Sequence, residues 1–264
     1  MTRTCLITGS SRGLGLQLVH AFLEAGYNVV ATARSPGKLA AKLPQRDDLR
    51  VVALDVTDPQ GVEAAVDEAI RAFGTIDVLI NSAGHAQLGF FEMTRQEAIR
   101  QEFEVNLFGP MTVTRAVLPW MRAQGSGLLV TISSSSGLVS APGGAVYSSS
   151  KFALEGWIAG LADEVAGFGI RSIVVNPGMM RTDFLDASSA RHGDIEIADY
   201  TEAACQFRAF IEGANHQQPG NPTELARRLA RLAGEAEPPK RVLFGEDAED
   251  AVRTTIAALS ADLA

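Results

Sequence analysis

Short apolar runs alternate with longer amphipathic segments along most of the chain. The apolar runs predict strands at Cys5–Thr8, Tyr27–Thr32, Arg50–Leu54, Ile76–Asn81, Leu128–Ser133, Arg171–Asn176 and Arg241–Phe244. Helical spacing between them predicts helices at Leu14–Ala25, Pro59–Phe73, Arg100–Ala123, Tyr147–Gly167, Thr223–Ala233 and Asp247–Leu259. Most strand runs are continuously apolar, as expected for strands that are covered on both faces. The sustained alternation of strand and helix predicts an α/β fold with a parallel, doubly wound sheet.

One segment, residues 179–222, departs from this rhythm. It contains no clear strand and only patchy helical character. Because a long irregular segment in a compact domain usually serves binding, we expect a substrate loop or lid here. The segment follows the sixth predicted strand, so it should lie at the carboxyl edge of the sheet, where such folds bind ligands.

Composition and charge narrow the class of protein. The 264 residues are 46% hydrophobic and 20% charged, a balance typical of globular proteins. The net charge of −8 argues against a general nucleic-acid or anionic-membrane binder, although it leaves room for a local basic pocket. Cys5 and Cys205 are too few for a disulfide framework or a zinc site, and His20, His192 and His216 have no partner at metal-ligand spacing. Without a signal-peptide pattern or a membrane-spanning apolar run, we expect a cytoplasmic protein.

The first predicted strand runs directly into the sequence TGSSRGLG, which contains Gly9, Gly13 and Gly15. Glycine permits a sharp turn and a close approach of the backbone to a phosphate. The helix that follows points its amide dipoles at the turn, which favours an anion there. The spacing differs from the G-x-G-x-x-G fingerprint, but strand, glycine turn and helix occur in the order of a dinucleotide site. A tight connection without a ligand is the alternative interpretation.

The second predicted strand bears on the choice of cofactor. NAD sites usually carry an acidic residue about 20 residues beyond the glycine turn, but no Asp or Glu occurs between Glu24 and Asp47. Arg34 stands at that position, and Arg12 lies within the glycine turn. Since a guanidinium binds a phosphate through two parallel hydrogen bonds, the pattern favours the 2′-phosphate of NADP(H). The alternative is that Arg34 is a solvated surface arginine.

The sequence YSSSK, from Tyr147 to Lys151, permits three interpretations. It is a serine-rich polar loop, a Ser-x-x-Lys hydrolase motif formed by Ser148 and Lys151, or a Tyr-x-x-x-Lys acid/base pair. The hydrolases also carry Ser-Asp-Asn and Lys-Thr-Gly elements, and neither string occurs in the chain. On a helix, Tyr147 and Lys151 are one turn apart and share a face. Free tyrosine has a pKa of about 10, which a nearby ammonium lowers toward the range useful for proton transfer.

Together these motifs resemble those of the short-chain dehydrogenases/reductases over nearly the whole chain. The matching sequences are TGSSRGLG, LDVTD (Leu54–Asp58), NSAG (Asn81–Gly84), VNLFG around Asn106, ISSSSG, YSSSK and NPGMMRT. PGMMRTDF, Asp199-Tyr200 and QPGNP further resemble ketone and alcohol oxidoreductases similar to 17β-hydroxysteroid dehydrogenases. The resemblance implies one Rossmann-type domain over residues 1–264, with about seven strands and with helices on both faces.

The resemblance also implies a catalytic group of Asn106, Ser134, Tyr147 and Lys151. The family's serine lies 13 residues before its tyrosine, which selects Ser134 from the run of four serines. Tyr147 would exchange a proton with the substrate oxygen, and Ser134 would hydrogen-bond that oxygen. Lys151 would also bind the nicotinamide ribose, and Asn106 would hold a water that relays protons.

Further residues are implied to bind the cofactor, around the phosphates, the adenine, the ribose and the nicotinamide. They are Gly9, Ser11, Arg12, Gly13, Leu14, Gly15, Arg34, Asp55, Val56, Asn81, Ala83, Gly84, Tyr147, Lys151, Pro177, Gly178, Met180 and Thr182. Ser82 departs from the second asparagine that is common in the family. The resemblance thus implies an NADP(H)-dependent oxidoreductase that interconverts a ketone or aldehyde and an alcohol. A catalytically silent NADP(H)-binding sensor or scaffold is the alternative, although such a protein should have lost Tyr147, Lys151 or Ser134.

The substrate side is less defined. His85 directly follows NSAG and is expected at the substrate cleft, although a buried, hydrogen-bonded histidine is an equal alternative. Ser134, Met179 and Phe184 are the other candidates, and the last two suit an apolar carbonyl or alcohol substrate. The family often assembles through the helices that correspond to Arg100–Ala123 and Tyr147–Gly167, so we expect a homodimer or homotetramer.

Overall fold

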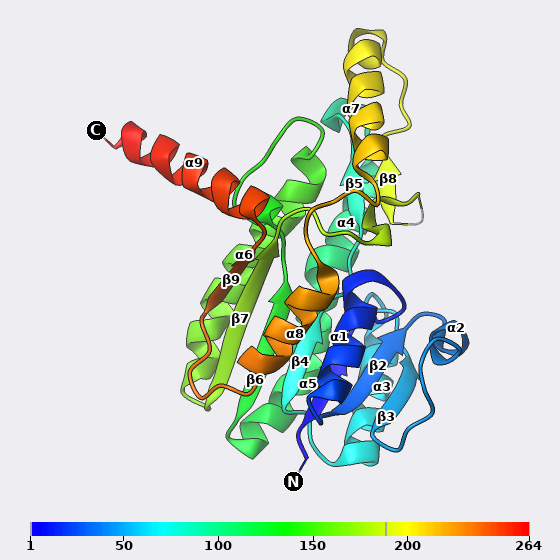
Figure 1. Ribbon diagram of the computed structural model, residues 1–264, viewed down its shortest axis with the longest axis vertical. Helices are drawn as coiled ribbons and strands as arrows, with labels where there is room; N and C mark the ends of the chain where they lie inside the picture. The colour runs from blue at the N-terminus through cyan, green and yellow to red at the C-terminus, as the bar shows by residue number, and fades with distance from the viewer. Residues whose placement is uncertain (1, 188, 264) are drawn as a thin grey trace.

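The computed structural model describes residues 2–187 and 189–263. At its centre is a seven-stranded parallel sheet in the order β3-β2-β1-β4-β6-β7-β9 (Figure 1). The strands are β1 (Thr4–Ile7), β2 (Asn28–Ala33), β3 (Leu49–Ala53), β4 (Val78–Asn81), β6 (Gly127–Ile132), β7 (Ile170–Pro177) and β9 (Arg241–Phe244). The strand order reverses between β1 and β4, and open α/β sheets bind ligands beyond the carboxyl ends at such a point. The predicted parallel, doubly wound sheet of about seven strands is confirmed.

Helices cover both faces of the sheet, as predicted. The helices of the described residues are α1 (Gly13–Glu24), α2 (Pro36–Ala40), α3 (Pro59–Phe73), α4 (Gln96–Phe103), α5 (Gly109–Gln124), α6 (Ala145–Ala166), α7 (Thr201–Ala214), α8 (Pro222–Leu232) and α9 (Glu246–Asp262). One hydrophobic cluster joins α1 and α8 to the sheet, and a second joins α3, α5 and α6 to the opposite face. In β1, Cys5 and Ile7 belong to the first cluster and Leu6 to the second. Because strand side chains alternate between faces, a continuously apolar strand fills both clusters.

The helix predicted over Arg100–Ala123 starts earlier and is interrupted. α4 begins at Gln96, residues Glu104–Phe108 form a π-helical turn, and α5 follows from Gly109. A π-turn holds an extra residue within a helix and often marks a functional site. No hydrophobic period announces such a local change in winding, so the sequence pattern predicted one continuous helix.

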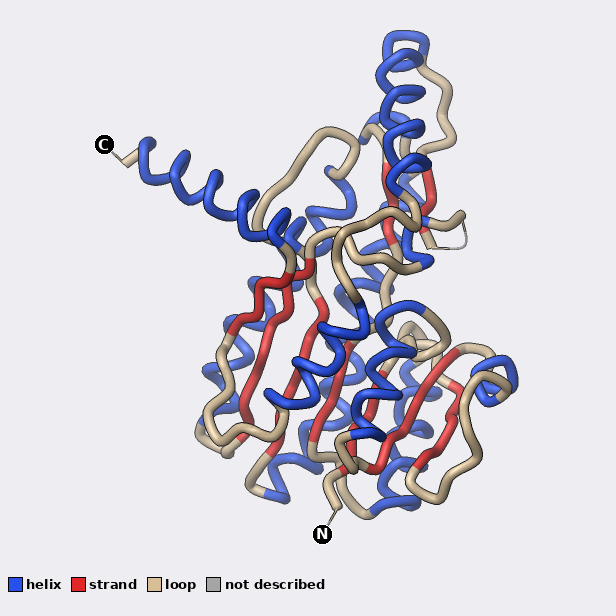
Figure 2. The backbone as a smooth tube through the Cα atoms, in the orientation of Figure 1, coloured by secondary structure: helices blue, strands red, loops and turns tan. Residues whose placement is uncertain are grey.

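The expectation of an irregular segment over residues 179–222 was wrong in part. Within its described residues, this stretch contains the short strand β8 (Ala190–His192) and one regular helix, α7. β8 pairs in parallel with β5 (Ala86–Leu88), and the pair forms a small second sheet. Side chains from β5, β8 and α7 form a third hydrophobic cluster. Figure 2 shows this unit above the carboxyl ends of the central strands, where the sequence placed the segment.

No helix among residues 2–187 and 189–263 combines the length and apolar character needed to cross a membrane.

Candidate active site

Ser134, Tyr147 and Lys151 meet at the carboxyl edge of the sheet. Ser134 lies just beyond β6, where its Oγ accepts a hydrogen bond from the Ser136 amide at 3.1 Å. A further hydrogen bond joins the Ser134 side chain to the Tyr147 side chain. α6 begins at Ala145, so Tyr147 and Lys151 lie in its first two turns and share a face. The structure therefore brings these three predicted catalytic side chains together.

Burial controls the ionisation of Tyr147. It raises the pKa of the phenol above its ordinary value, the hydrogen bond with Ser134 acts in the opposite direction, and the charge of Glu102 raises the pKa further. Tyr147 therefore keeps its proton at neutral pH, so it can donate to an oxygen placed beside it.

Lys151 is almost fully buried, and its Nζ donates a hydrogen bond to the main-chain oxygen of Ile132 at 3.1 Å. The ammonium lies 5.8 Å from the centre of the Tyr147 ring. Burial lowers the pKa of Lys151 to about 8, while the carboxylates of Glu102 and Glu155 act in the opposite direction. Lys151 thus titrates close to physiological pH, and its charge depends on buried acidic neighbours.

Asn106 lies in the π-turn and is buried. Its Nδ2 donates to the main-chain oxygen of His85 at 3.0 Å and to Oε1 of Glu102 at 2.8 Å, and its Oδ1 accepts from the His85 amide at 3.1 Å. A Cβ on Gly84 would lie 3.2 Å from Asn106 Oδ1 and 3.9 Å from Lys151 Nζ. The missing side chain of Gly84 therefore leaves the space between two predicted catalytic groups open.

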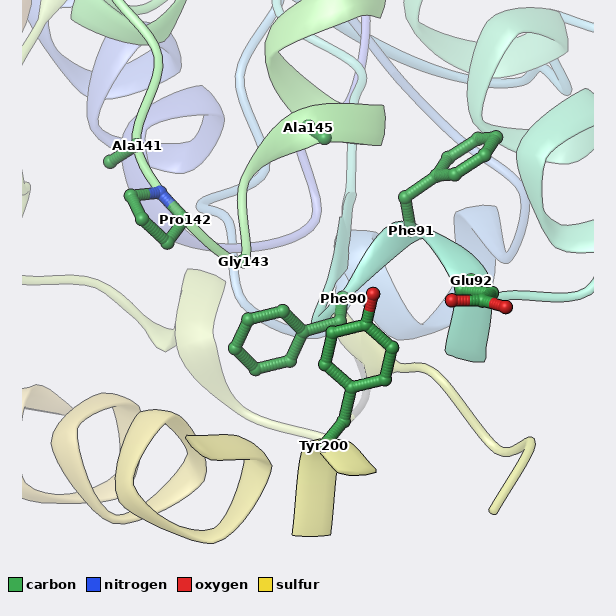
Figure 3. A pocket seen from close by; sticks show the side chains of 8 residues that line it. All are labelled: Phe90, Phe91, Glu92, Ala141, Pro142, Gly143, Ala145 and Tyr200. Atoms are coloured by element: carbon green, nitrogen blue, oxygen red, sulfur yellow. The ribbon is translucent and has the colours of Figure 1, made fainter. Parts of the chain in front are cut away.

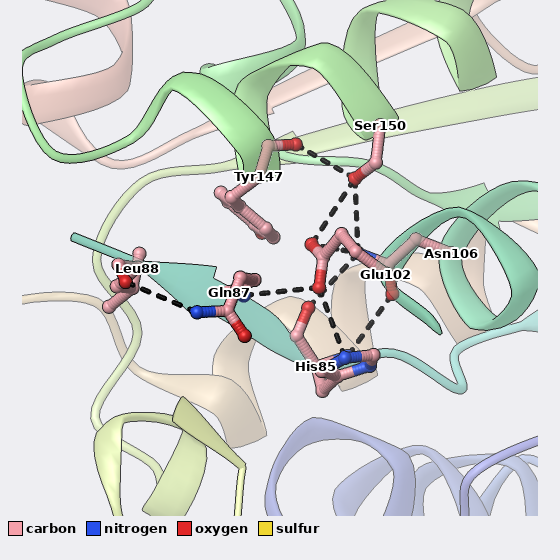
Figure 4. A network of polar contacts seen from close by, with 7 residues as sticks. All are labelled: His85, Gln87, Leu88, Glu102, Asn106, Tyr147 and Ser150. Carbon is pink, nitrogen blue, oxygen red and sulfur yellow. Dashed lines mark hydrogen bonds and ion pairs between the residues drawn. The ribbon is translucent and has the colours of Figure 1, made fainter. Parts of the chain in front are cut away.

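A buried polar network surrounds Asn106 (Figure 4). Glu102 is fully buried, and its Oε1 accepts hydrogen bonds from Asn106 and from Ser150 Oγ, the latter at 3.3 Å. Its Oε2 accepts from the Gln87 amide at 3.0 Å. His85 Nε2 lies 3.1 Å from the same oxygen but is not aimed at it well enough for a hydrogen bond.

Burial favours the neutral form of both groups in this network. It raises the pKa of Glu102 to about 7, and it lowers the pKa of His85 to about 4. The imidazole of His85 contacts Glu102. Its predicted contact with the substrate stays a prediction.

The glycine turn has the shape expected for a phosphate site. Gly9 and Gly13 have φ values of +71° and +52°, which favour glycine. A Cβ on Gly9 would lie 2.7 Å from the Cα of Ala83 in the next loop. α1 begins with no side-chain cap and no acidic residue in its first turn, so its amides can bind an anion. The turn, with Ser11, Leu14 and Gly15, fits the phosphates of a dinucleotide.

Basic residues gather beside this turn. Arg34 is exposed directly after β2, and the Ser10 amide donates to the Thr32 oxygen at 2.9 Å, which ties the turn to the end of that strand. Arg12 precedes α1, with its Nε 3.9 Å from Asp183. Lys42, which sequence reasoning missed, donates from Nζ to the main-chain oxygen of Ser11 at 2.9 Å. The surroundings of the turn are therefore locally positive in a chain of net negative charge.

The other predicted cofactor residues lie at the same edge of the sheet. Asp55 and Val56 follow β3, Asn81 ends β4, and Ala83 and Gly84 lie in the loop beyond it. Thr8 Oγ1 accepts hydrogen bonds from the amides of Ser82 and Ala83, at 3.0 and 3.1 Å, and so joins this loop to β1. Asn81 Nδ2 donates to Thr114 Oγ1 at 3.0 Å, whereas its buried Oδ1 has no hydrogen-bond partner within the described part of the chain.

The loop beyond β7 is held by α9. Pro177 ends the strand, and Oδ2 of Asp247, in the first turn of α9, accepts a hydrogen bond from the Met179 amide at 2.7 Å. A Cβ on Gly178 would collide with the Asp247 carboxylate. Met180 pairs with Gly220 in an isolated bridge, and Thr182 Oγ1 accepts from the amide of Phe184 at 3.2 Å.

An apolar surface adjoins Tyr147. The ring of Phe184 lies 6.1 Å from the Tyr147 ring, and both pack against the cluster formed by β5, β8 and α7. Nearby, Phe90 stacks on Tyr200 with ring centres 5.2 Å apart. An open cavity of about 420 Å³ lies here (Figure 3), lined by Phe90, Phe91, Glu92, Ala141, Pro142, Gly143, Ala145 and Tyr200. Ala145 precedes Tyr147 by two positions on α6, so the cavity reaches the start of the catalytic helix.

Sequence reasoning missed three residues of this site. Glu102 lies four positions before Asn106, a spacing that puts both on one helical face, and this was an available signal. Lys42 and Asp247 reach the site from chain segments far from the motifs, and no local pattern announces them.

Residues 3–193 match the family model described as "short chain dehydrogenase". "Oxidoreductase BOA17" of Botryotinia fuckeliana is 39% identical over 263 residues, which cover 99% of this chain and 95% of that protein. A 3-ketodihydrosphingosine reductase of Bacteroides thetaiotaomicron is 32% identical over 240 residues, covering 91% of this chain and 87% of that protein.

A solved short-chain dehydrogenase from Streptomyces avermitilis has a TM-score of 0.88 and 36% identity, covering 99% of this chain and 96% of its own. Among other solved structures of similar fold, some hold NADP and others NAD.

Proposed function

The chain belongs to the short-chain dehydrogenase family, and on that basis we propose that it is an NADP(H)-dependent oxidoreductase that interconverts a ketone or aldehyde and an alcohol. The observation that carries the proposal is the meeting of Ser134, Tyr147 and Lys151 beside a glycine turn that fits a dinucleotide. Hydride transfer needs a proton donor or acceptor at the substrate oxygen, and this group provides one.

Each member of the catalytic group has a separate task. Tyr147 gives its phenolic proton to the oxygen of a carbonyl during reduction, or takes a proton from an alcohol during oxidation. The Ser134 hydroxyl hydrogen-bonds the same oxygen and stabilises the charge that develops there. The positive charge of Lys151 favours the phenolate after the proton has left. Asn106, beside the space at Gly84, would hold a water through which that proton is relayed to solvent.

The bound nicotinamide would supply or accept the hydride. The amides of the glycine turn would bind its pyrophosphate, and Asp55 and Val56 would contact the adenine. Asn81, Ala83, Gly84 and Lys151 would hold the riboses, and the loop from Pro177 to Thr182 would bind the nicotinamide end. Arg34 and Arg12, with Lys42 close by, would bind a 2′-phosphate, and no Asp or Glu occurs between Glu24 and Asp47, where an NAD site usually carries its acidic residue.

The substrate is proposed to be an apolar carbonyl compound. Phe184 beside Tyr147, and the aromatic lining of the nearby cavity, suit a hydrophobic group attached to the reacting carbon. A long-chain ketone is a reasonable first probe, because one relative is a 3-ketodihydrosphingosine reductase. The segment of residues 179–222 would close over this substrate as a lid on the single domain.

A homodimer or homotetramer is proposed to form through α5 and α6. Trp120 on α5 and Phe152 on α6 are large apolar side chains that are 40% and 47% exposed, and a partner subunit would cover them.

The test combines cofactor binding with turnover. Fluorescence titration should show NADPH binding at least tenfold more tightly than NADH, and NADPH should then be oxidised in the presence of apolar ketones. Tighter NADH binding would contradict the cofactor assignment alone. NADPH binding without turnover of any carbonyl compound would favour the alternative of a silent binding protein.

A further inference from the structure

Glu102 is a buried acid that the proposed chemistry does not use. Its side chain is 0% exposed and contacts three elements of the site. The Asn106 amide donates to Oε1 at 2.8 Å, the Ser150 hydroxyl lies 3.3 Å from the same oxygen, and the Gln87 amide donates to Oε2 at 3.0 Å. Burying a carboxyl group is costly unless hydrogen bonds or a counter-charge compensate, so its presence here calls for a function.

The second acid that acts on Lys151 is already neutralised. Glu155 Oε2 accepts a hydrogen bond from Arg241 at 2.8 Å, and its Oε1 accepts from Asn176 Nδ2 at 2.6 Å. Glu102 differs, because within residues 2–187 and 189–263 no arginine or lysine lies at ion-pair distance from it. The negative charge of Glu102 is therefore available to act on Lys151.

Geometry connects Glu102 with Lys151. Asn106 holds the Glu102 carboxylate with its Nδ2, while its Oδ1 borders the open space at Gly84. Lys151 Nζ borders the same space, because a Cβ on Gly84 would lie 3.9 Å from it. Ser150, which contacts Glu102, is also the residue directly before Lys151 on α6. Asn106 thus contacts the carboxylate and borders the space next to the ammonium, and the two charges attract each other.

We propose that Glu102 is a positioning residue of the active site, whose buried carboxylate orients Asn106 and supplies the negative charge that keeps Lys151 protonated. The proposal rests on the proposed function, because it gives Glu102 its effect through the catalytic Lys151. Protonated Lys151 in turn lowers the cost of forming the Tyr147 phenolate.

The surrounding charged groups set the pH range in which Glu102 can act on Lys151. His85, Lys151 and Arg191 face Glu102 from the loop before β5, from α6 and from β8. Burial raises the pKa of Glu102 to about 7, so the carboxylate carries its charge mainly above neutral pH. Burial lowers the pKa of Lys151 to about 8, and Glu102 opposes that shift. Glu102 is therefore charged in the pH range where Lys151 would otherwise lose its proton.

The four lysines of the chain allow a direct test without turnover. They are Lys38, Lys42, Lys151 and Lys240, and all but Lys151 are exposed. With ¹³C at the lysine ε-carbon, NMR titration of the wild type should show one signal with a midpoint near pH 8. In E102Q that midpoint should fall by about one pH unit, since a neighbouring charge typically shifts a pKa by about 1–3 units. The exposed lysines serve as internal references.

Two variants and one activity measurement separate charge from structure. E102D keeps the charge, so its Lys151 midpoint should stay closer to that of the wild type than to that of E102Q. E104Q removes an exposed carboxylate two positions away and should leave the midpoint unchanged. In carbonyl reduction, the high-pH limb of kcat/KM should move to lower pH in E102Q by the same amount as the NMR midpoint.

Several outcomes would overturn the proposal. One is an E102Q midpoint that moves no further than that of E104Q, and another is a rate loss that is equal at every pH. If E102Q does not fold, ¹³C NMR of the wild-type glutamate carboxyl groups decides instead. A glutamate that titrates near pH 7 supports the proposal, and titration of every glutamate below about pH 5.5 overturns it. Absence of turnover alone would count against the proposed function and leave the NMR result valid.

Discussion

Tyr147 and Lys151 lie on one face of α6, with the Lys151 ammonium 5.8 Å from the centre of the Tyr147 ring. Lys151 Nζ donates to the Ile132 oxygen, and no hydrogen bond joins it to Tyr147 within the described residues, but a buried ammonium at this distance can act on the phenol through its charge. We therefore expect Lys151 to act on Tyr147 through charge, and Tyr147, with Ser134 beside it, to meet the substrate oxygen.

Replacing Tyr147 by Phe tests this division of tasks. Y147F removes the hydroxyl and keeps the ring, so kcat for carbonyl reduction should fall by about 10²-fold or more, while the Kd for NADPH should change less than about threefold. Steady-state kinetics and fluorescence titration measure the two effects. Y27F is the matched control, because Tyr27 is a buried tyrosine at the amino edge of the sheet. Equal activity losses in both variants would contradict the assignment.

Replacing Arg34 by Ala tests the choice of cofactor. A hydrogen bond to a charged group is worth about 1.5–3 kcal/mol, so R34A should weaken NADPH binding by roughly tenfold or more. NADH binding should hardly change, because NADH lacks the 2′-phosphate. Titrations with both cofactors give the ratio. R46A is the control, since Arg46 pairs with Asp48 before β3, at the opposite edge of the sheet. A similar loss of affinity for both cofactors in R34A would show that Arg34 does not select NADPH.

The sheet and the catalytic helix could be predicted because their signals are local. Each central strand carries its own apolar run, and Tyr147 and Lys151 are close in sequence as well as in space. The β5–β8 pair gave no such signal, because each strand has three residues and its partner lies about a hundred positions away. Such short strands persist through tertiary packing, here against α7, and local propensity does not announce them.

The polar side of the site shows the same limit. The sequence placed Asn106 in a helix but did not predict the π-turn, which depends on local winding. It also did not predict that His85 faces Glu102, because the loop before β5 and α4 come together only in the tertiary structure. The residues that belong to a sequence motif could therefore be predicted, whereas the buried charged groups that shift their pKa values could not.

The stability of the protein should depend on pH through Glu102. Its pKa is near 7 when folded, above the ordinary value of about 4.5, so the folded state binds the proton more tightly. The resulting stabilisation is complete below pH 4.5 and is lost as the pH rises through 7. The melting temperature of the wild type minus that of E102Q should therefore fall by roughly 5 °C between pH 5 and pH 8. A constant difference between the two melting curves would contradict the raised pKa.

Phe184 should determine how well the site accepts bulky substrates. Its ring lies 6.1 Å from that of Tyr147, so F184A removes apolar surface beside the proposed acid/base residue. KM should rise more for large apolar ketones than for small ones, by roughly tenfold for a group that fills the lost contact. F168A, on the exposed turn between α6 and β7, is the control. Equal changes of KM for large and small ketones would show that Phe184 does not contact the substrate.

Gly9 and Gly26 form a matched pair for the glycine turn. Both have a left-handed backbone, with φ values of +71° and +80°. A Cβ on Gly9 would lie 2.7 Å from the Cα of Ala83, whereas a Cβ on Gly26 would meet nothing within 4 Å. G26A should therefore cost only the backbone strain of roughly 1–2 kcal/mol and keep NADPH affinity.

G9A should cost more in unfolding free energy, because it must also push the loop after β4 away from the turn. That loop carries Ala83 and Gly84, both predicted to contact the cofactor, so NADPH affinity should fall by at least tenfold in the protein that still folds. Chemical denaturation and fluorescence titration measure the two effects on the same samples. If G9A bound NADPH as well as G26A does, the close packing of Gly9 against Ala83 would not be what shapes the cofactor site.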